Sequence, residues 1–155
     1  MIKHSATTCP ICRASQIRVV RRGRETKSIS YRDTALDRYM KSDLCNGFRI
    51  ERNQVQLSDM SQCEREAMNS LPDTFTVYRG YATAGEIDSN RLMAAQSWTT
   101  NESVAKKFVQ HHELFLENEM DIYECNSTVV SKVVHKSDVI AVLLGKDEAE
   151  ILLSK

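Results

Sequence analysis

The sequence changes character at Pro72, and this change constrains the fold more than any other feature. Before Pro72, apolar residues recur at helical spacing from Tyr31 to Leu44, and a second helix is indicated between Ser61 and Leu71. After Pro72, short runs rich in β-branched and aromatic residues follow one another. Helices that precede a series of strands are typical of an α+β domain, whereas a parallel sheet requires alternating helices and strands.

The N-terminal part, residues 1–71, is predicted to be a basic and mainly helical lobe of a single domain that spans residues 1–155. Residues 1–30 contain few apolar residues apart from Ile17 to Val20, so we expect an irregular arm there. The helix from Tyr31 to Leu44 is expected to stop before Gly47. Ser61 and Glu64 have the spacing of a capping box, and Pro72 ends the second helix; its apolar face is formed by Met60, Cys63, Ala67 and Leu71.

The C-terminal part, residues 72–155, is predicted to be the β-rich core. Phe75 to Tyr78 forms a strand that enters a turn at Gly80, and Ser97 to Thr100 ends another strand. Asn101 and Glu102 then begin a helix whose buried stripe consists of Val104, Ala105, Phe108 and Val109. Four consecutive strands are expected at Met120–Cys125, Val129–Val134, Asp138–Leu144 and Ala149–Leu153.

The charge distribution is uneven although the chain carries 21 basic and 21 acidic residues. Residues 1–50 contain 11 Lys and Arg against 4 Asp and Glu, an excess of +7, and residues 51–155 carry the opposite excess. The basic third would suit an anionic partner, either nucleic acid or an acidic protein. An ordinary solvated surface is the alternative interpretation.

The hydropathy and the cysteine content indicate the cellular compartment in which the protein is expected. No run approaches the roughly 20 apolar residues that span a bilayer, and Met1 is not followed by an apolar signal region, so we expect a cytoplasmic protein that contacts no membrane. The cysteine number, five, is odd, which fits a reducing compartment. Cys9 and Cys12 form half of a zinc motif that lacks its second half, so unpaired thiols are favoured over a zinc site.

Three short motifs follow one another in the β-rich part. They are Tyr78-Arg79-Gly80, Ser97-Trp98-Thr99 and Glu148-Ala149-Glu150. Their order and spacing resemble the Arg-Ser-Glu, or cholera-toxin-like, class of mono-ADP-ribosyltransferases, and the resemblance covers about residues 72–155. The chain departs from the family's Ser-Thr-Ser segment at Trp98 and Thr99.

The resemblance implies a split β-sandwich with an N-terminal helical lobe, whose cleft binds NAD+ as a substrate and needs no metal. The reaction transfers ADP-ribose to a macromolecular acceptor, either a protein arginine or RNA or DNA. Small members of the class resemble phage effectors and the toxins of toxin-antitoxin or phage-defence systems, so an inhibitory partner such as an antitoxin is a reasonable hypothesis. The residues that contact NAD+ would be Tyr78, Arg79, Gly80, Ser97, Trp98 and Thr99.

Each expected catalytic residue has a physical reason. Cleavage of the nicotinamide-ribose bond develops an oxocarbenium-like cation, which the carboxylate of Glu150 would stabilise. A hydroxyl on the neighbouring strand can orient this carboxylate, and the resemblance implies this role for Ser97, with support from Thr99. The planar guanidinium of Arg79 suits the two phosphates. Glu148 would face the same side of an extended strand as Glu150 and act on the acceptor.

Several assignments around the site have alternatives. Trp98 and Phe108 could stack on the nicotinamide, although core packing is favoured for Phe108. Gln110–Glu119, which includes His111, His112 and Phe115, matches a mobile loop over NAD+ in the family or an ordinary acidic connection. Leu143–Asp147 matches the loop that contacts the acceptor. For the whole chain, the alternatives are an NAD+ glycohydrolase and a non-catalytic nucleic-acid-binding module that uses the basic N-terminal part.

Overall fold

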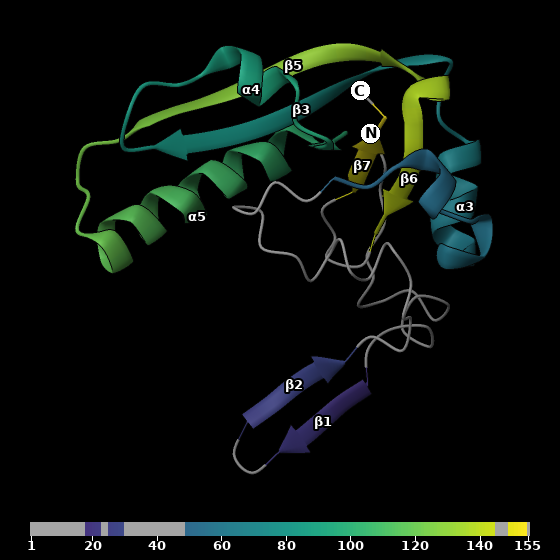
Figure 1. Ribbon diagram of the computed structural model, residues 1–155, viewed down its shortest axis with the longest axis horizontal. Coiled ribbons are helices and arrows are strands. Elements are labelled where there is room, and N and C mark those ends of the chain that lie inside the picture. The colour runs from purple at the N-terminus through teal and green to yellow at the C-terminus, as the bar shows by residue number, and fades with distance from the viewer. Residues whose placement is uncertain (1–17, 23–24, 30–48, 145–148, 155) are drawn as a thin grey trace.

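The computed structural model describes residues 18–22, 25–29, 49–144 and 149–154 (Figure 1). These residues form an α+β fold with one five-stranded antiparallel sheet. None of the helices in these ranges is long and apolar enough to cross a membrane. The elements in chain order are β1 (Arg18–Arg22), β2 (Glu25–Ile29), the 3-10 helices η2 (Arg52–Gln54) and η3 (Leu57–Asp59), α3 (Gln62–Asn69), β3 (Thr74–Thr83), α4 (Ser89–Met93), β4 (Ser97–Thr99), α5 (Glu102–Met120), β5 (Asn126–His135), the 3-10 helix η4 (Lys136–Asp138), β6 (Val139–Leu143) and β7 (Glu150–Leu153).

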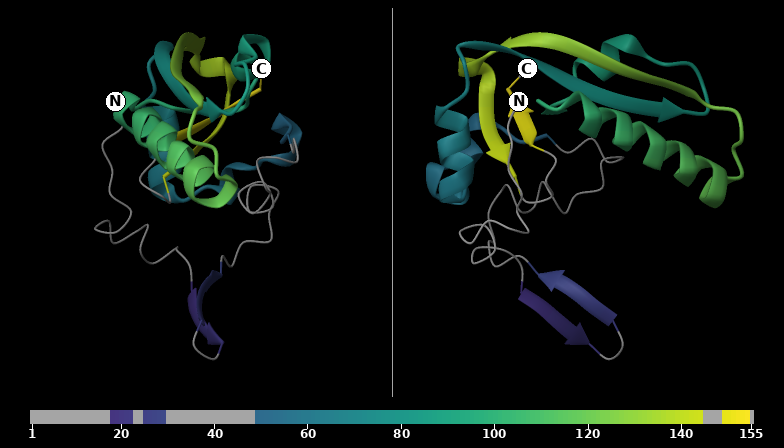
Figure 2. Two further views of the ribbon diagram at one scale, coloured as in Figure 1. Left: turned by 90° about the vertical axis from the view of Figure 1, so that its left-hand side faces the viewer. Right: turned by 180° about the vertical axis from the view of Figure 1, so that it is seen from behind.

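The large sheet consists of two parts that meet at a narrow boundary. Its strand order is β5-β3-β4-β7-β6. Strands β3 and β5 pair over ten residues, and β7 pairs with both β4 and β6. Between β3 and β4, however, only Tyr78 and Thr99 are paired. Strands β6 and β7 run steeply across the direction of β3 and β5 (Figures 1 and 2). We call this boundary the β3–β4 seam.

The seam bears on the predicted fold class. The α+β class is confirmed, and the described strands of the large sheet are continuous across the seam. The ADP-ribosyltransferase-like split β-sandwich is a more specific arrangement and stays a prediction. A sheet joined by a single residue pair has little ladder to hold its two parts together, so side chains near the seam must fix their separation.

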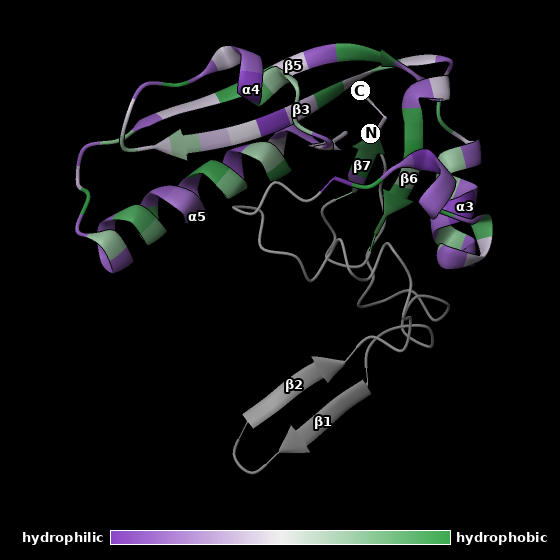
Figure 3. Ribbon diagram, viewed as in Figure 1, coloured by the Kyte–Doolittle hydropathy of each residue, from purple (hydrophilic) through white to green (hydrophobic). Residues whose placement is uncertain are grey.

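Two hydrophobic clusters cover the two faces of β7. Ile151 and Leu153 belong to the first cluster together with Val77 and Trp98, whereas Leu152 belongs to the second, which contains Ile50, Met60 and Leu143. This alternation follows from the period of two along a strand. All of β6 is buried, and β6 and β7 are strongly hydrophobic in Figure 3. The C-terminal strands therefore form the centre of the core.

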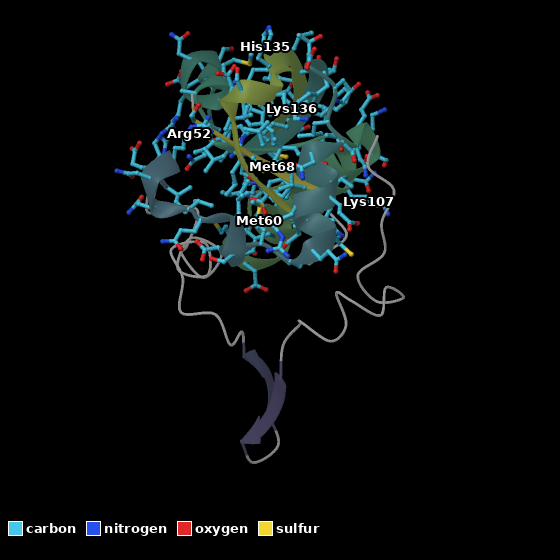
Figure 4. All side chains as sticks on the ribbon, turned by 90° about the vertical axis from the view of Figure 1, so that its right-hand side faces the viewer. Arg52, Met60, Met68, Lys107, His135 and Lys136 are labelled. Carbon is cyan, nitrogen blue, oxygen red and sulfur yellow. The ribbon has the colours of Figure 1, made fainter. Side chains whose placement is uncertain are left out.

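The capping box predicted before α3 is confirmed, and its glutamate also bonds to the residue after β6. Ser61 Oγ accepts a hydrogen bond from the Glu64 N–H, and Glu64 Oε1 accepts one from the Ser61 N–H at 2.8 Å. Glu64 Oε2 also accepts a hydrogen bond from the Leu144 N–H at 2.9 Å. The buried carboxylate thus ties α3 to the end of β6. Met60 and Met68, labelled in Figure 4, pack against the second hydrophobic cluster, which includes residues of β6 and β7.

Helix α5 is longer than predicted, which corrects two expectations. Asn101 occupies the N-cap position as expected, but the helix continues through Gln110–Glu119 to Met120. The segment expected as a loop is therefore helical, and the strand expected at Met120–Cys125 is not formed. Residues with high helix propensity, such as Glu and Leu, dominate this segment, and the buried Leu116 anchors it to the protein. The helix ends at Asp121, which has a left-handed backbone.

One expectation for the N-terminal part also changes. Within the range expected as an arm, β1 and β2 pair as an antiparallel hairpin, with Arg18 opposite Ile29. Strand β1 contains Val19 and Val20, residue types that favour an extended backbone. The other described elements of residues 1–71 are α3, η2 and η3. The helix expected at Tyr31–Leu44 lies outside the described residues, so the mainly helical lobe stays a prediction.

Gly80 lies inside β3, which continues to Thr83 instead of turning at Gly80 as predicted. Helix α5 packs so closely here that a Cβ atom on Gly80 would overlap the Ala105 carbonyl oxygen and lie 2.6 Å from Val109 Cγ2. The position requires glycine because a helix backbone approaches it, not because the chain turns.

We expect Gly80→Ala to lower the free energy of unfolding by about 1–3 kcal/mol, because α5 must move away from β3 to admit the methyl group. Urea denaturation followed by circular dichroism measures the loss. Gly85→Ala is the matched control, since a Cβ atom there meets nothing within 4 Å. Equal stability of the two variants would contradict the close packing of α5 on β3.

Candidate functional site

The three sequence motifs lie on three adjacent strands of the large sheet. Arg79 is on β3, Ser97 begins β4 and Glu150 begins β7. Thr99 pairs with Tyr78 on one side and with Glu150 on the other. Directly paired residues in antiparallel strands point to the same face. The fold therefore brings positions 78, 99 and 150 into one row across the sheet, beside the seam.

The hydrogen bond expected between Ser97 and Glu150 is present. Ser97 Oγ donates to Glu150 Oε1 over 2.6 Å, and both groups are partly buried. This length is typical of a hydroxyl that donates to a carboxylate. Because each residue is fixed by the β4–β7 ladder, the carboxylate has a defined orientation, which a reaction centre would need.

Arg79 extends across the seam. Its Nη1 donates to the Ser97 carbonyl oxygen over 2.6 Å, and the contact is partly buried. This bond joins β3 to β4 next to the single Tyr78–Thr99 pair. The guanidinium and the carboxylate thus both bind Ser97, one at its main chain and one at its side chain. Ser97 is the centre of the cluster.

The other residues of the first two motifs are Trp98, Thr99, Tyr78 and Gly80. Trp98 is only 2% exposed, belongs to the first core cluster, and donates from Nε1 to the Ala95 carbonyl oxygen. Its ring therefore fills the core and does not present a surface on which a ligand could stack. Thr99 Oγ1 accepts a hydrogen bond from the Asn101 N–H at the corner that leads into α5. Tyr78 is half-buried, and Gly80 contacts α5.

The reasoning that placed Glu148 on the same side as Glu150 fails at the residue between them. Ala149 has a φ angle of 45°, in the left-handed region, so the extended backbone begins only at Glu150. A non-glycine residue adopts this conformation at a cost of about 1–2 kcal/mol. Glu148 itself lies outside the described residues, as does most of the expected acceptor loop Leu143–Asp147.

The residues predicted in a loop over the substrate form an aromatic cluster on α5. The His112 ring makes edge or tilted contacts with Tyr81, Phe108 and Phe115. Phe108 is 42% exposed and Phe115 is 51% exposed, so the prediction that Phe108 packs in the core is wrong. The reason is geometric, because the buried line of α5 runs through Ala105 and Leu116, and Phe108 lies beside it.

Sequence reasoning missed Gln96, which holds β4 in place from its N-terminal side. This buried amide accepts a hydrogen bond from the Ile50 N–H and donates to the carbonyl oxygens of Ile50 and Leu153. The side chain thereby joins the segment before η2 to the end of β7. A glutamine between Ala95 and Ser97 gives no sequence signal, because its three partners are distant in the chain.

The expected zinc-motif residues Cys9 and Cys12 lie outside the described residues. Within residues 49–144 and 149–154, no group of three or more His, Cys, Asp or Glu side chains is placed to hold a metal ion. The cluster around Ser97 supplies a guanidinium, a hydroxyl and a carboxylate.

We expect Ser97→Ala to lower the free energy of unfolding by about 1–3 kcal/mol, because Glu150 loses a short hydrogen bond in a partly buried site. Thermal and urea denaturation check the value. Ser127→Ala on the exposed face of β5 is the control and should change stability by less than about 0.5 kcal/mol. If both variants were as stable as the wild type, Ser97 would not hold the carboxylate.

No protein-family model, no curated protein and no solved structure matches the chain. A function for this chain therefore has to be inferred from the arrangement of Arg79, Ser97 and Glu150.

Proposed function

We propose that this protein is an NAD+-dependent mono-ADP-ribosyltransferase that transfers ADP-ribose to a macromolecule. The observation that carries the proposal is the 2.6 Å hydrogen bond from Ser97 to Glu150, held between β4 and β7 and next to Arg79 of β3. The three residues occur in the order of the Arg-Ser-Glu transferases, and they meet in space although 18 and 53 positions separate Ser97 from Arg79 and Glu150.

In the proposed reaction, the bond between the nicotinamide nitrogen and ribose C1′ breaks, and its electron pair leaves with the nicotinamide. The positive charge that develops at C1′ and the ring oxygen is greatest in the transition state. The Glu150 carboxylate stabilises this charge and can accept a hydrogen bond from the ribose 2′-hydroxyl. A nucleophilic atom of the acceptor then forms the new bond to C1′ and loses a proton.

The neighbouring residues support these steps. Ser97 donates to one carboxylate oxygen, so it fixes the direction of Glu150 before the substrate arrives. Arg79 bonds to the Ser97 carbonyl oxygen, and its guanidinium suits the diphosphate of NAD+. Glu148, as the family resemblance implies, would orient the acceptor or accept its proton. Water in the acceptor's place would give hydrolysis of NAD+.

The acceptor is proposed to be a protein arginine or a nucleic acid. The excess of +7 charges in residues 1–50 favours an anionic partner. The resemblance to phage effectors and to the toxins of toxin-antitoxin systems suggests a toxin or effector with an inhibitory partner. Binding of nucleic acid through this region should weaken steeply as salt is raised.

Incubation with labelled NAD+ and cell lysate tests the proposal. We expect wild type to label macromolecules and release nicotinamide, and Glu150→Gln to reduce both on the order of 100-fold to 1,000-fold. Glutamine retains the size of the side chain and an oxygen that can accept from Ser97, but it lacks the charge. Glu86→Gln, at an exposed position outside the cluster, should keep full activity.

The products separate the alternatives. Label that protease removes indicates a protein acceptor, and label that nuclease removes indicates RNA or DNA. Free ADP-ribose without labelled macromolecules would instead identify an NAD+ glycohydrolase. Wild type that neither binds NAD+ nor releases nicotinamide would contradict the proposal and favour the nucleic-acid-binding module.

A further inference from the structure

Lys132 of β5 reaches across β3 to the strand that carries Ser97. It pairs with Val77 in the β3–β5 ladder, yet its ammonium lies 4.4 Å from the centroid of the Trp98 ring on β4. The same Nζ donates to the Met93 carbonyl oxygen over 3.1 Å. An exposed lysine would normally extend into solvent, whereas this side chain joins the two parts of the sheet.

Trp98 is well placed to transmit this contact. It lies between Ser97 and Thr99, and the alternation along β4 directs its side chain to the opposite face from theirs. All three residues of β4 pair with β7, but only Thr99 pairs with β3, so the ladder holds β4 only weakly relative to β3. The position of β4 relative to β3 therefore depends on how its central side chain is held, and a shift of Trp98 would move Ser97 relative to β3.

The electrostatic surroundings of Lys132 also connect it to the start of β4. Met93 and Ala94 end α4 just before β4, and their carbonyl oxygens accept hydrogen bonds from Lys132 and Arg49. Carbonyl groups at a helix C-terminus lack helical partners and attract cations. Burial lowers the pKa of Lys132, the charge of Arg49 lowers it further, and Asp138 raises it in part. The cation is held beside Trp98 despite this penalty.

We propose that Lys132 is a positioning residue for the Ser97–Glu150 pair. Its contact with Trp98 and its bond to Met93 set the place of β4 relative to β3, and thereby align the Ser97–Glu150 pair with Arg79 of β3. Two side chains thus cross the seam: Lys132 of β5 bonds to the Met93 carbonyl oxygen, and Arg79 of β3 bonds to the Ser97 carbonyl oxygen. The expected effect on turnover rests on the proposed transferase function, while the effect on β4 does not.

The first experiment measures the environment of Trp98 and the amide hydrogen exchange of β4, and it requires no enzymatic activity. Trp98 is the single tryptophan of the chain, so its fluorescence reports directly on the contact. We expect Lys132→Gln to shift the emission and to speed amide hydrogen exchange in β4 about tenfold, whereas Lys132→Arg keeps a cation over the ring and behaves like wild type. Lys136→Gln is the matched control, because Lys136 also donates to a carbonyl oxygen, that of Asn69, away from Trp98.

The second experiment measures transfer from NAD+ by the same folded variants. Misalignment of Ser97 should lower kcat about 10-fold to 100-fold in Lys132→Gln with little change in KM, and Lys132→Arg should restore it. Lys136→Gln should match wild type, because Lys136, labelled in Figure 4, begins η4 and bonds to Asn69 instead of contacting Trp98.

The outcomes separate the two proposals. Unchanged fluorescence and exchange in Lys132→Gln would overturn the positioning role. An equal loss of kcat in Lys132→Gln and Lys132→Arg would also overturn it. A wild type without transfer activity would remove the proposed function, and the first experiment would still decide whether Lys132 holds β4.

Discussion

The structure depends on how two parts of one sheet are joined at the β3–β4 seam. A single backbone pair, Tyr78 with Thr99, connects the long β3–β5 pair to the β4-β7-β6 group. A full antiparallel ladder would hold these parts by several hydrogen bonds, but it would leave no place for a side chain between them. Arg79 occupies the boundary instead and binds the main chain of Ser97. The single backbone pair therefore explains two features: the two parts of the sheet are weakly connected, and the candidate site lies at their boundary.

The rest of the fold makes this arrangement rigid. Strand β7 is covered on both faces by core clusters, so Glu150 starts from a fixed backbone. On the other side, α5 contacts β3 at Gly80, next to Arg79, with no room for a side chain between them. Gln96 joins the start of β4 to the end of β7. Ser97 therefore lies among elements that are joined to one another by several contacts, which suits a group that must orient a carboxylate.

Local patterns in the sequence are sufficient to predict those elements that depend on neighbouring residues. The capping box at Ser61, the start of α5 at Asn101 and the strands from Val129 onward depend on neighbouring residues, and the structure contains them. The predictions failed where tertiary contacts decide. The sequence around Gly80 predicts a turn, because the close contact of Gly80 with α5 cannot be seen in the sequence. The segment after Gln110 matches a loop in the sequence, although it continues α5.

By itself, the sequence determined the α+β class, the order of the three motifs and the residue types from which the candidate site is built, because these depend on composition and spacing along the chain. Only the tertiary structure decided that Ser97 bonds to Glu150, that Trp98 is buried, that Phe108 is exposed, and that Lys132 contacts Trp98. These contacts join residues far apart in sequence. They arise from strand pairing and from the competition of side chains for the core, neither of which has a local sequence signal.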